Sequence, residues 1–232
     1  MARKLLTPSK RRLWSQHVAL YRAVFFESLR VLALSPSLPN DEDKISAELL
    51  VICTDLCVKL SKGNNIEVPA PLFQLPCQDV QKVKAVGFKA AKRPDFTCPK
   101  FDHSSGRYIF LAIEVKLLGI PTSPSWILNK NYVNHGIQRF DCATHEYGKN
   151  APSGIMLGYI VSMSPPEVLR EVNQTLSGMA TPPPKLDFTF EGFVFESEQL
   201  LIRSNVRPQS FTLSHIWTDL RQCTNKLGAD MT

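Results

Sequence analysis

Tyr108-Ile109-Phe110-Leu111-Ala112-Ile113-Glu114-Val115-Lys116-Leu117-Leu118 is the stretch of sequence that decides the fold. Its apolar, β-rich composition predicts a central strand over residues 107–118, buried on both faces. Side chains alternate along a strand, so Glu114 and Lys116 share one face and Val115 packs on the opposite side. Burying an unpaired charge is costly, so two charges in such a strand need a partner or a function. We therefore expect Glu114 and Lys116 to project into a cleft at the end of the strand.

Helical and strand-like segments alternate on either side of this strand. Apolar stripes predict helices over residues 11–34, 41–62, 129–147, 165–179 and 214–226. Further strands are expected at residues 83–90, 96–98, 154–161, 188–196 and 200–203. This order predicts an α/β fold in which helices flank a mixed central sheet. We divide the chain into an N-terminal helical extension (1–40), a core (41–180) and a C-terminal β/α addition (181–232) packed on the same domain.

The composition limits the protein class and the partners. The chain has 232 residues, of which 44% are hydrophobic, and no apolar run approaches the roughly 20 residues of a membrane span. The N-terminus lacks the apolar segment of a secretory signal, so we expect a cytoplasmic protein with reduced thiols and no membrane partner. The six cysteines form no CxxC pair, which favours buried structural thiols over a zinc site. The net charge of +6 permits a polyanionic partner.

A second carboxylate lies upstream of the charged strand. Pro94-Asp95 is followed, after eighteen residues, by Glu114-Val115-Lys116. Two carboxylates at strand ends suit a hard cation such as Mg²⁺, which takes oxygen ligands and completes its shell with water and phosphate oxygens. A nearby lysine can help to deprotonate a metal-bound water or can neutralise developing negative charge. These are the requirements of phosphodiester hydrolysis. The plainer alternative is an ion pair of Glu114 and Lys116 at a frayed strand end, with Asp95 in a turn.

This pattern resembles the PD-(D/E)xK motif of the restriction-endonuclease-like nucleases, whose core is a helix, three strands, a helix and a strand. The resemblance covers residues 41–163 and implies an αβββαβ core for this chain. It implies that Asp95 and Glu114 are metal ligands, that Val115 is a further metal-ligating position, and that Lys116 is the catalytic lysine.

The resemblance also implies supporting residues. Glu48 is the expected catalytic carboxylate on the first core helix, and Gln138 and Arg139 are expected to bind substrate from the helix after the motif strand. Lys92 and Arg93, just before the proline-aspartate pair, are expected to contact phosphate. A solvated polar surface explains each of these positions almost as well.

The function implied by the resemblance is a metal-dependent nuclease. Mg²⁺ is the expected cofactor, for which Mn²⁺ would substitute, and DNA is the expected substrate. By analogy with single-domain nucleases of this size, we expect an effector of prokaryotic anti-phage defence. It would act with further copies of itself or with a separate helicase, ATPase or sensor subunit. The alternative is a catalytically inactive subunit with the same fold that binds nucleic acid or another protein.

Overall fold

The structure is a computed structural model that describes residues 13–64, 67–75, 92–103 and 105–224. Its helices are α1 (Trp14–Leu32), α2 (Glu42–Asn64), α4 (Leu128–Asn134), the 3₁₀ helix η1 (Ile137–Asp141), α5 (Pro165–Ser177) and α6 (Arg221–Thr224). Its strands are β1 (Leu72–Phe73), β2 (Phe96–Asp102), β3 (Arg107–Leu118), β4 (Ser153–Ile160), β5 (Val194–Ile202) and β6 (Ser210–Asp219).

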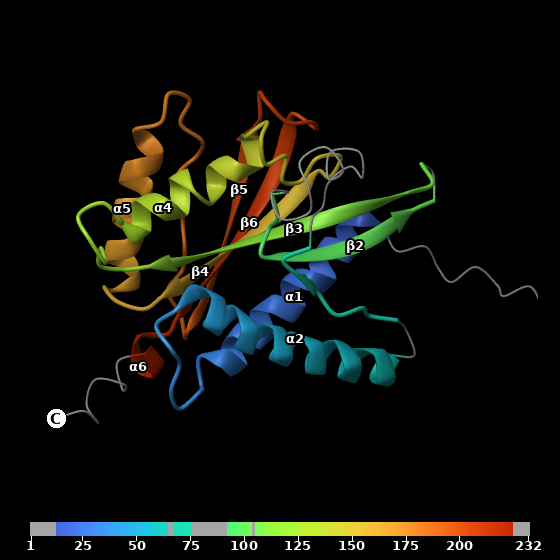
Figure 1. The fold of residues 1–232 in the computed structure, drawn as a ribbon, viewed down its shortest axis with the longest axis horizontal. Helices are drawn as coiled ribbons and strands as arrows, with labels where there is room; N and C mark the ends of the chain where they lie inside the picture. Colours follow the sequence, from blue (N-terminus) through green and yellow to red (C-terminus); the bar gives the residue numbers. More distant parts are fainter. Residues whose placement is uncertain (1–12, 65–66, 76–91, 104, 225–232) are drawn as a thin grey trace, which may run out of the picture.

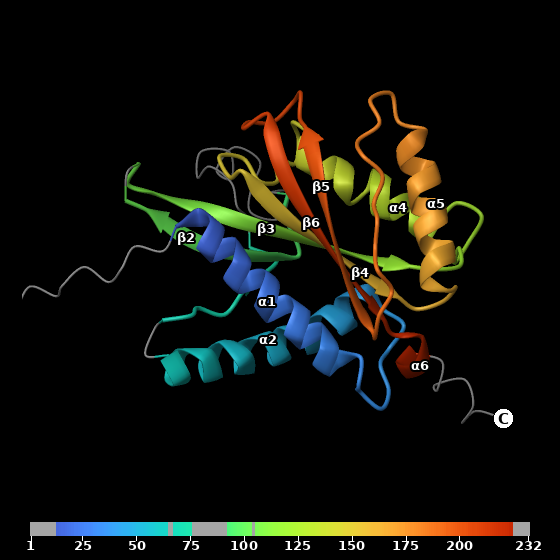
Figure 2. The same ribbon diagram turned by 180° about the vertical axis from the view of Figure 1, so that it is seen from behind.

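The six strands form one mixed sheet in the order β1-β2-β3-β4-β6-β5. Strands β3, β4 and β6 run parallel to one another, whereas β2 is antiparallel to β3 and β5 is antiparallel to β6. Helices α1 and α2 lie against one face of this sheet and α4 and α5 against the other (Figures 1 and 2). The expected α/β fold with a mixed, helix-flanked sheet is therefore confirmed.

Strand β3 contributes alternate side chains to two apolar cores. Leu111, Ile113 and Val115 belong to the core shared with α1 and α2, whereas Ala112 and Leu118 belong to the core beneath α4 and α5. Val115 therefore packs away from the face that carries its two charged neighbours, as the alternation predicts. Helix α1 is part of the first core and packs against α2.

Most elements near the proposed motif agree with the sequence. The helices expected over residues 11–34, 41–62 and 165–179 correspond to α1, α2 and α5, and the strand at 107–118 is β3. A proline in the first turn and a capping box between Ser164 and Glu167 begin α5. The strand expected at 83–90 lies outside the described residues. Within the described ranges, no helix is both long enough and apolar enough to cross a membrane.

The single helix expected over residues 129–147 is wrong. Helix α4 ends at Asn134, and the chain continues through Gly136 into the short helix η1. A Cβ atom on Gly136 would lie 2.4 Å from the carbonyl oxygen of Tyr132 and 2.5 Å from Cε of Met156. Glycine therefore allows a close approach to β4 and also weakens the helix at this point.

The C-terminal elements also differ from the prediction. Residues 214–219, expected in a helix, lie in strand β6, and the strands expected at 188–196 and 200–203 are replaced by the single strand β5. Strand β6 lies between β4 and β5 with both faces covered, so its apolar pattern has neither the helical nor the alternating period. The C-terminal segment thus adds β6 and β5 beside β4 at one end of the sheet.

Candidate active site

The proposed site lies where β3 extends beyond β2. Phe96, the first residue of β2, pairs with Ile113, so Asp95 stands beside Glu114 and the rest of β3 has an open edge on that side. Two carboxylates accept hydrogen bonds from the edge. Asp95 Oδ2 lies 2.7 Å from the backbone nitrogen of Val115, and Glu42 Oε2 lies 2.8 Å from that of Leu117. These bonds hold both carboxylates against the end of β3.

Glu114 is at the centre of the cluster and is fully buried. Its Oε1 atom lies 3.0 Å from Lys116 Nζ and also accepts a hydrogen bond from Arg139. Its Oε2 atom is buried without a hydrogen-bond partner in the described part of the chain. A buried carboxylate oxygen normally has a partner, so this atom is free to accept a hydrogen bond or to ligate a cation.

Lys116 connects the carboxylates to one another. Its Nζ atom lies 2.9 Å from Glu42 Oε1 and donates a hydrogen bond to the carbonyl oxygen of Val115 as well as contacting Glu114. Its side chain is only 12% exposed. The lysine is therefore fixed in place by three oxygen atoms from β3 and from the first turn of α2.

Arg139 reaches the cluster because the chain breaks after α4. Residues His135 and Gly136 separate α4 from η1, and η1 places Arg139 over β3. Tyr147 supports the opposite side of the site, because its hydroxyl donates a hydrogen bond to the carbonyl oxygen of Arg93, two residues before Asp95. The irregular segment after η1 thus helps to position Asp95.

The carboxylates have perturbed acidities. Burial raises the pKa of Asp95 to about 6, although Lys116 and the bond from Val115 oppose the change. Burial, followed by the charge of Asp95, raises the pKa of Glu114 to about 8, although Lys116 and Arg139 oppose it. Asp95 thus raises the pKa of Glu114, and Glu42 raises that of Asp95, so the cluster is a place where added positive charge is stabilising.

The pKa of Lys116 is raised although the side chain is buried. Burial alone would lower its pKa, but Glu114, Glu42 and Asp95 outweigh burial and raise the pKa of Lys116 above its ordinary value. The amine is therefore protonated at neutral pH. Lys116 is thus a fixed positive charge beside the carboxylates in this arrangement.

The donor atoms of the cluster fit a hard divalent cation. Asp95 and Glu114 offer carboxylate oxygens, and Glu114 Oε2 has no other partner in the described part of the chain. Three carboxylates face two cations, Lys116 and Arg139, so the ionised cluster has one negative charge in excess. No group of three or more acidic, histidine or cysteine side chains among the described residues is arranged to hold a metal ion. A two-carboxylate site completed by water and substrate oxygens is the Mg²⁺ arrangement that these residues fit.

The structure brings only some of the predicted residues together. Asp95, Glu114, Lys116 and Arg139 converge, and Val115 takes part through its backbone atoms. Arg139, expected to bind substrate, instead contacts Glu114. Glu48 is exposed on α2, and no hydrogen bond or ion pair described here joins it to the cluster, so the structure does not place it with the other predicted catalytic residues.

Glu42 is the carboxylate of α2 that reaches the site, and the sequence analysis missed it. Asp41, Glu42 and Asp43 read as ordinary acidic residues at a helix N-terminus, which the helix dipole favours. Only the position of this helix end beside the open edge of β3 distinguishes Glu42 from its neighbours.

A groove of about 960 Å³ begins at Arg139 and extends away from the cluster. Lys92 and Gln138, two of the predicted substrate-binding residues, line it, and both side chains are exposed. His145 also lines it; burial, with further contributions from Arg139 and Lys92, lowers the pKa of His145 to about 4. This groove therefore has positively charged walls close to the carboxylate cluster.

Comparison of the chain with known proteins gives no match to a family model, to a curated protein or to a solved structure.

Proposed function

We propose that this chain is a Mg²⁺-dependent nuclease of the PD-(D/E)xK type that hydrolyses phosphodiester bonds in DNA. The observation that carries the proposal is the convergence of Asp95, Glu114 and Lys116 at the end of β3, together with the buried Oε2 atom of Glu114, which has no hydrogen-bond partner in the described part of the chain. An apolar strand between two helical layers would be more stable without three ionisable groups at its end. The presence of these three ionisable groups at the end of β3 therefore supports a metal site that binds phosphate.

The order of the elements supports the same proposal. Among the described elements, helix α2, strands β1, β2 and β3, helices α4 and η1, and strand β4 occur in this order along the chain. That is the order which the resemblance implies for a restriction-endonuclease-like core. The motif residues lie at the start of β2 and near the end of β3, two adjacent antiparallel strands.

Each residue of the cluster has a role in the proposed reaction. Asp95 and Glu114 would hold Mg²⁺, with Mn²⁺ as a substitute, and the ion would polarise the phosphate and provide an activated water. Lys116 holds a positive charge beside the phosphate and stabilises the charge that develops during attack. Glu42 fixes Lys116, and Arg139 orients Glu114 while further guanidinium N–H groups remain to contact phosphate.

A cleavage assay tests this proposal. Purified protein is incubated with supercoiled plasmid and with single- and double-stranded oligonucleotides in Mg²⁺, in Mn²⁺ and in a chelator. The variants Glu114→Gln and Lys116→Met are expected to lose at least about 100-fold in rate, as when a preorganised charge is removed. Glu42→Gln, which loses the ion pair that fixes Lys116, is expected to lose about 10- to 100-fold.

Glu48→Gln is the matched control, because Glu48 lies on the same helix as Glu42 but is exposed. It is expected to cleave at the wild-type rate, and thermal melting checks that every variant is folded. Unchanged cleavage by Glu114→Gln and Lys116→Met would overturn the site assignment. Wild-type protein that binds DNA but cleaves nothing under either metal would favour the inactive binding subunit. The role in anti-phage defence stays a prediction.

A further inference from the structure

The β2–β3 hairpin carries exposed aromatic side chains on the face that bears the proposed site. Tyr108 and Phe110 have the same orientation along β3 as Glu114, because they precede it by six and four residues. Phe101 pairs directly with Tyr108 across the hairpin and so stands on the same face. The row extends from Glu114 to the tip of the hairpin over roughly 20 Å, at about 3.4 Å per residue.

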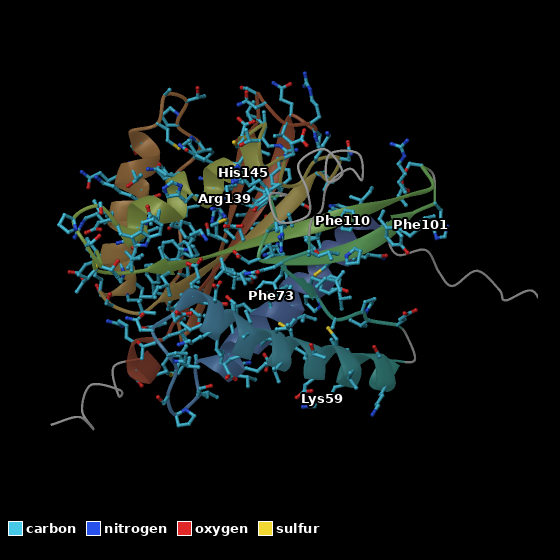
Figure 3. The ribbon with its side chains drawn as sticks, viewed as in Figure 1. Lys59, Phe73, Phe101, Phe110, Arg139 and His145 are labelled. Atoms are coloured by element: carbon cyan, nitrogen blue, oxygen red, sulfur yellow. The ribbon has the colours of Figure 1, made fainter. Side chains whose placement is uncertain are left out.

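Two of these three rings are open to solvent, whereas Phe110 is half-buried. Tyr108 is 60% exposed and Phe101 is 40% exposed. Figure 3 shows Phe110 and Phe101 in sequence toward the tip, with Arg139 at the opposite end of the row. The hairpin extends beyond the helices that cover the rest of the sheet (Figure 1). Farther from the tip, β3 is fully buried on both faces: Leu111 and Ile113 against the layer of α1 and α2, and Ala112 on the face of the aromatic row.

The rings contact one another without forming a core. The centroids of Phe101 and Tyr108 are 5.3 Å apart in an edge-to-face arrangement, and those of Tyr108 and Phe110 are 6.4 Å apart. His103 adds a further ring 4.9 Å from Phe101. Edge contacts of this kind leave ring faces available to an incoming planar group.

We propose that this aromatic row binds the unpaired bases of a single-stranded nucleic acid and leads the strand to the carboxylate cluster. This inference rests on the proposed nuclease function and assigns its substrate class. Unpaired bases are the planar groups that stack on exposed aromatic side chains, whereas the base faces of a duplex are already stacked on one another. The row lies on the same face of β3 as Glu114, so a strand lying on it would be led toward the carboxylate cluster, where Ala112 and Glu114 are buried.

The charge around the site fits the phosphates of such a strand. Lys92, Gln138 and Arg139 line the groove on the other side of the cluster from the hairpin. Stacking platforms combined with a basic groove are the usual means by which proteins bind single strands without reading sequence. The nucleic acid would therefore be held by base stacking on one side of the phosphodiester bond that is cleaved, and by phosphate contacts on the other side.

Binding measured without divalent metal separates this inference from the proposed cleavage. Fluorescence anisotropy in a chelator compares a labelled single-stranded oligonucleotide of mixed sequence with a blunt duplex of equal length. The wild-type protein is expected to prefer the single strand. Tyr108→Ala and Phe101→Ala are each expected to weaken single-strand binding by about fivefold or more, and Tyr108→Phe is expected to preserve it.

Phe193→Ala is the matched control, because Phe193 is a similarly exposed phenyl ring, 43%, beside the far end of the sheet at β5. Preference for the duplex, or equal binding by Tyr108→Ala and the control, would overturn the inference and leave the nuclease proposal standing. Loss of single-strand binding in Tyr108→Ala, with a wild-type protein that never cleaves, would support the inference and refute the nuclease. A change of oligomeric state on light scattering in Tyr108→Ala alone would assign the row to an interface between copies and overturn the inference.

Discussion

The raised pKa of Glu114 makes folding depend on pH, and the proposed metal binding would depend on pH in the opposite direction. The pKa of Glu114 is raised from 4.5 to about 8, so the folded state retains a proton that the unfolded state has lost. The contribution of Glu114 to stability is therefore fully present below pH 4.5 and is lost as the pH rises through about 8. Metal binding requires the deprotonated carboxylates and so strengthens over the same range.

We expect Mg²⁺ to raise the melting temperature more at pH 8.5 than at pH 6.5, as measured by thermal unfolding with and without the ion. Burial lowers the pKa of His215 to about 3. Protonation of His215 therefore changes stability mainly below pH 6.5, outside this window. The variant Glu114→Gln should show a flatter pH dependence without metal. An equal Mg²⁺ effect at the two pH values would contradict the assignment of these carboxylates as ligands.

Single residues also show how far the sequence predicts the site. Glu114, Lys116 and Asp95 were identifiable because two charges interrupt an apolar strand and a proline-aspartate pair precedes it. Glu42 was not identifiable, since its role depends on a tertiary contact, the 2.8 Å bond to Leu117 at an open strand edge. Glu48 is also a carboxylate on α2, but its side chain is exposed.

At the scale of elements, the break between α4 and η1 determines whether Arg139 reaches Glu114. The apolar periodicity of residues 129–147 predicts one helix, because the pattern of apolar residues does not reveal a break at Gly136. The structure makes this glycine necessary, because a Cβ atom there would lie within 2.6 Å of both Tyr132 and Met156. Since the atom met at Tyr132 is a backbone oxygen, the helix rather than a side chain would have to move.

We expect Gly136→Ala to lower the free energy of unfolding by about 1–3 kcal/mol, as measured by urea denaturation, and to lower the rate of any cleavage by displacing Arg139. Gly63→Ala in α2 is the matched control, because nothing lies within 4 Å of a Cβ atom at that position. The control is expected to be neutral or to gain up to about 1 kcal/mol from the higher helix propensity of alanine. Equal stability of the two variants would show that η1 can shift freely.

At the scale of the whole molecule, strands that are distant in sequence form the centre of the sheet. Strand β6 pairs with β4 from Ser153 to Ile160 and carries Trp217, which is fully buried. Trp217 Nε1 donates a hydrogen bond to Tyr132 of α4, whose hydroxyl also lies 2.8 Å from His215 Nδ1. The sequence could not predict this arrangement, because a strand covered on both faces has no periodic pattern and its partners are set by topology alone.

This arrangement predicts that residues 1–180 do not fold alone. Removing residues 181–232 would expose the edge of β4, leave Tyr132 without its two buried partners and uncover the core beneath α4 and α5. Unfilled core volume and unpaired buried groups of this extent exceed the 5–15 kcal/mol by which a typical domain is stable. We expect the truncated chain to give no cooperative thermal transition by circular dichroism, and co-expression of 181–232 as a separate chain to restore one. A truncated chain that melts cooperatively by itself would place the domain boundary near residue 180 and would make β5 and β6 an addition to a complete core.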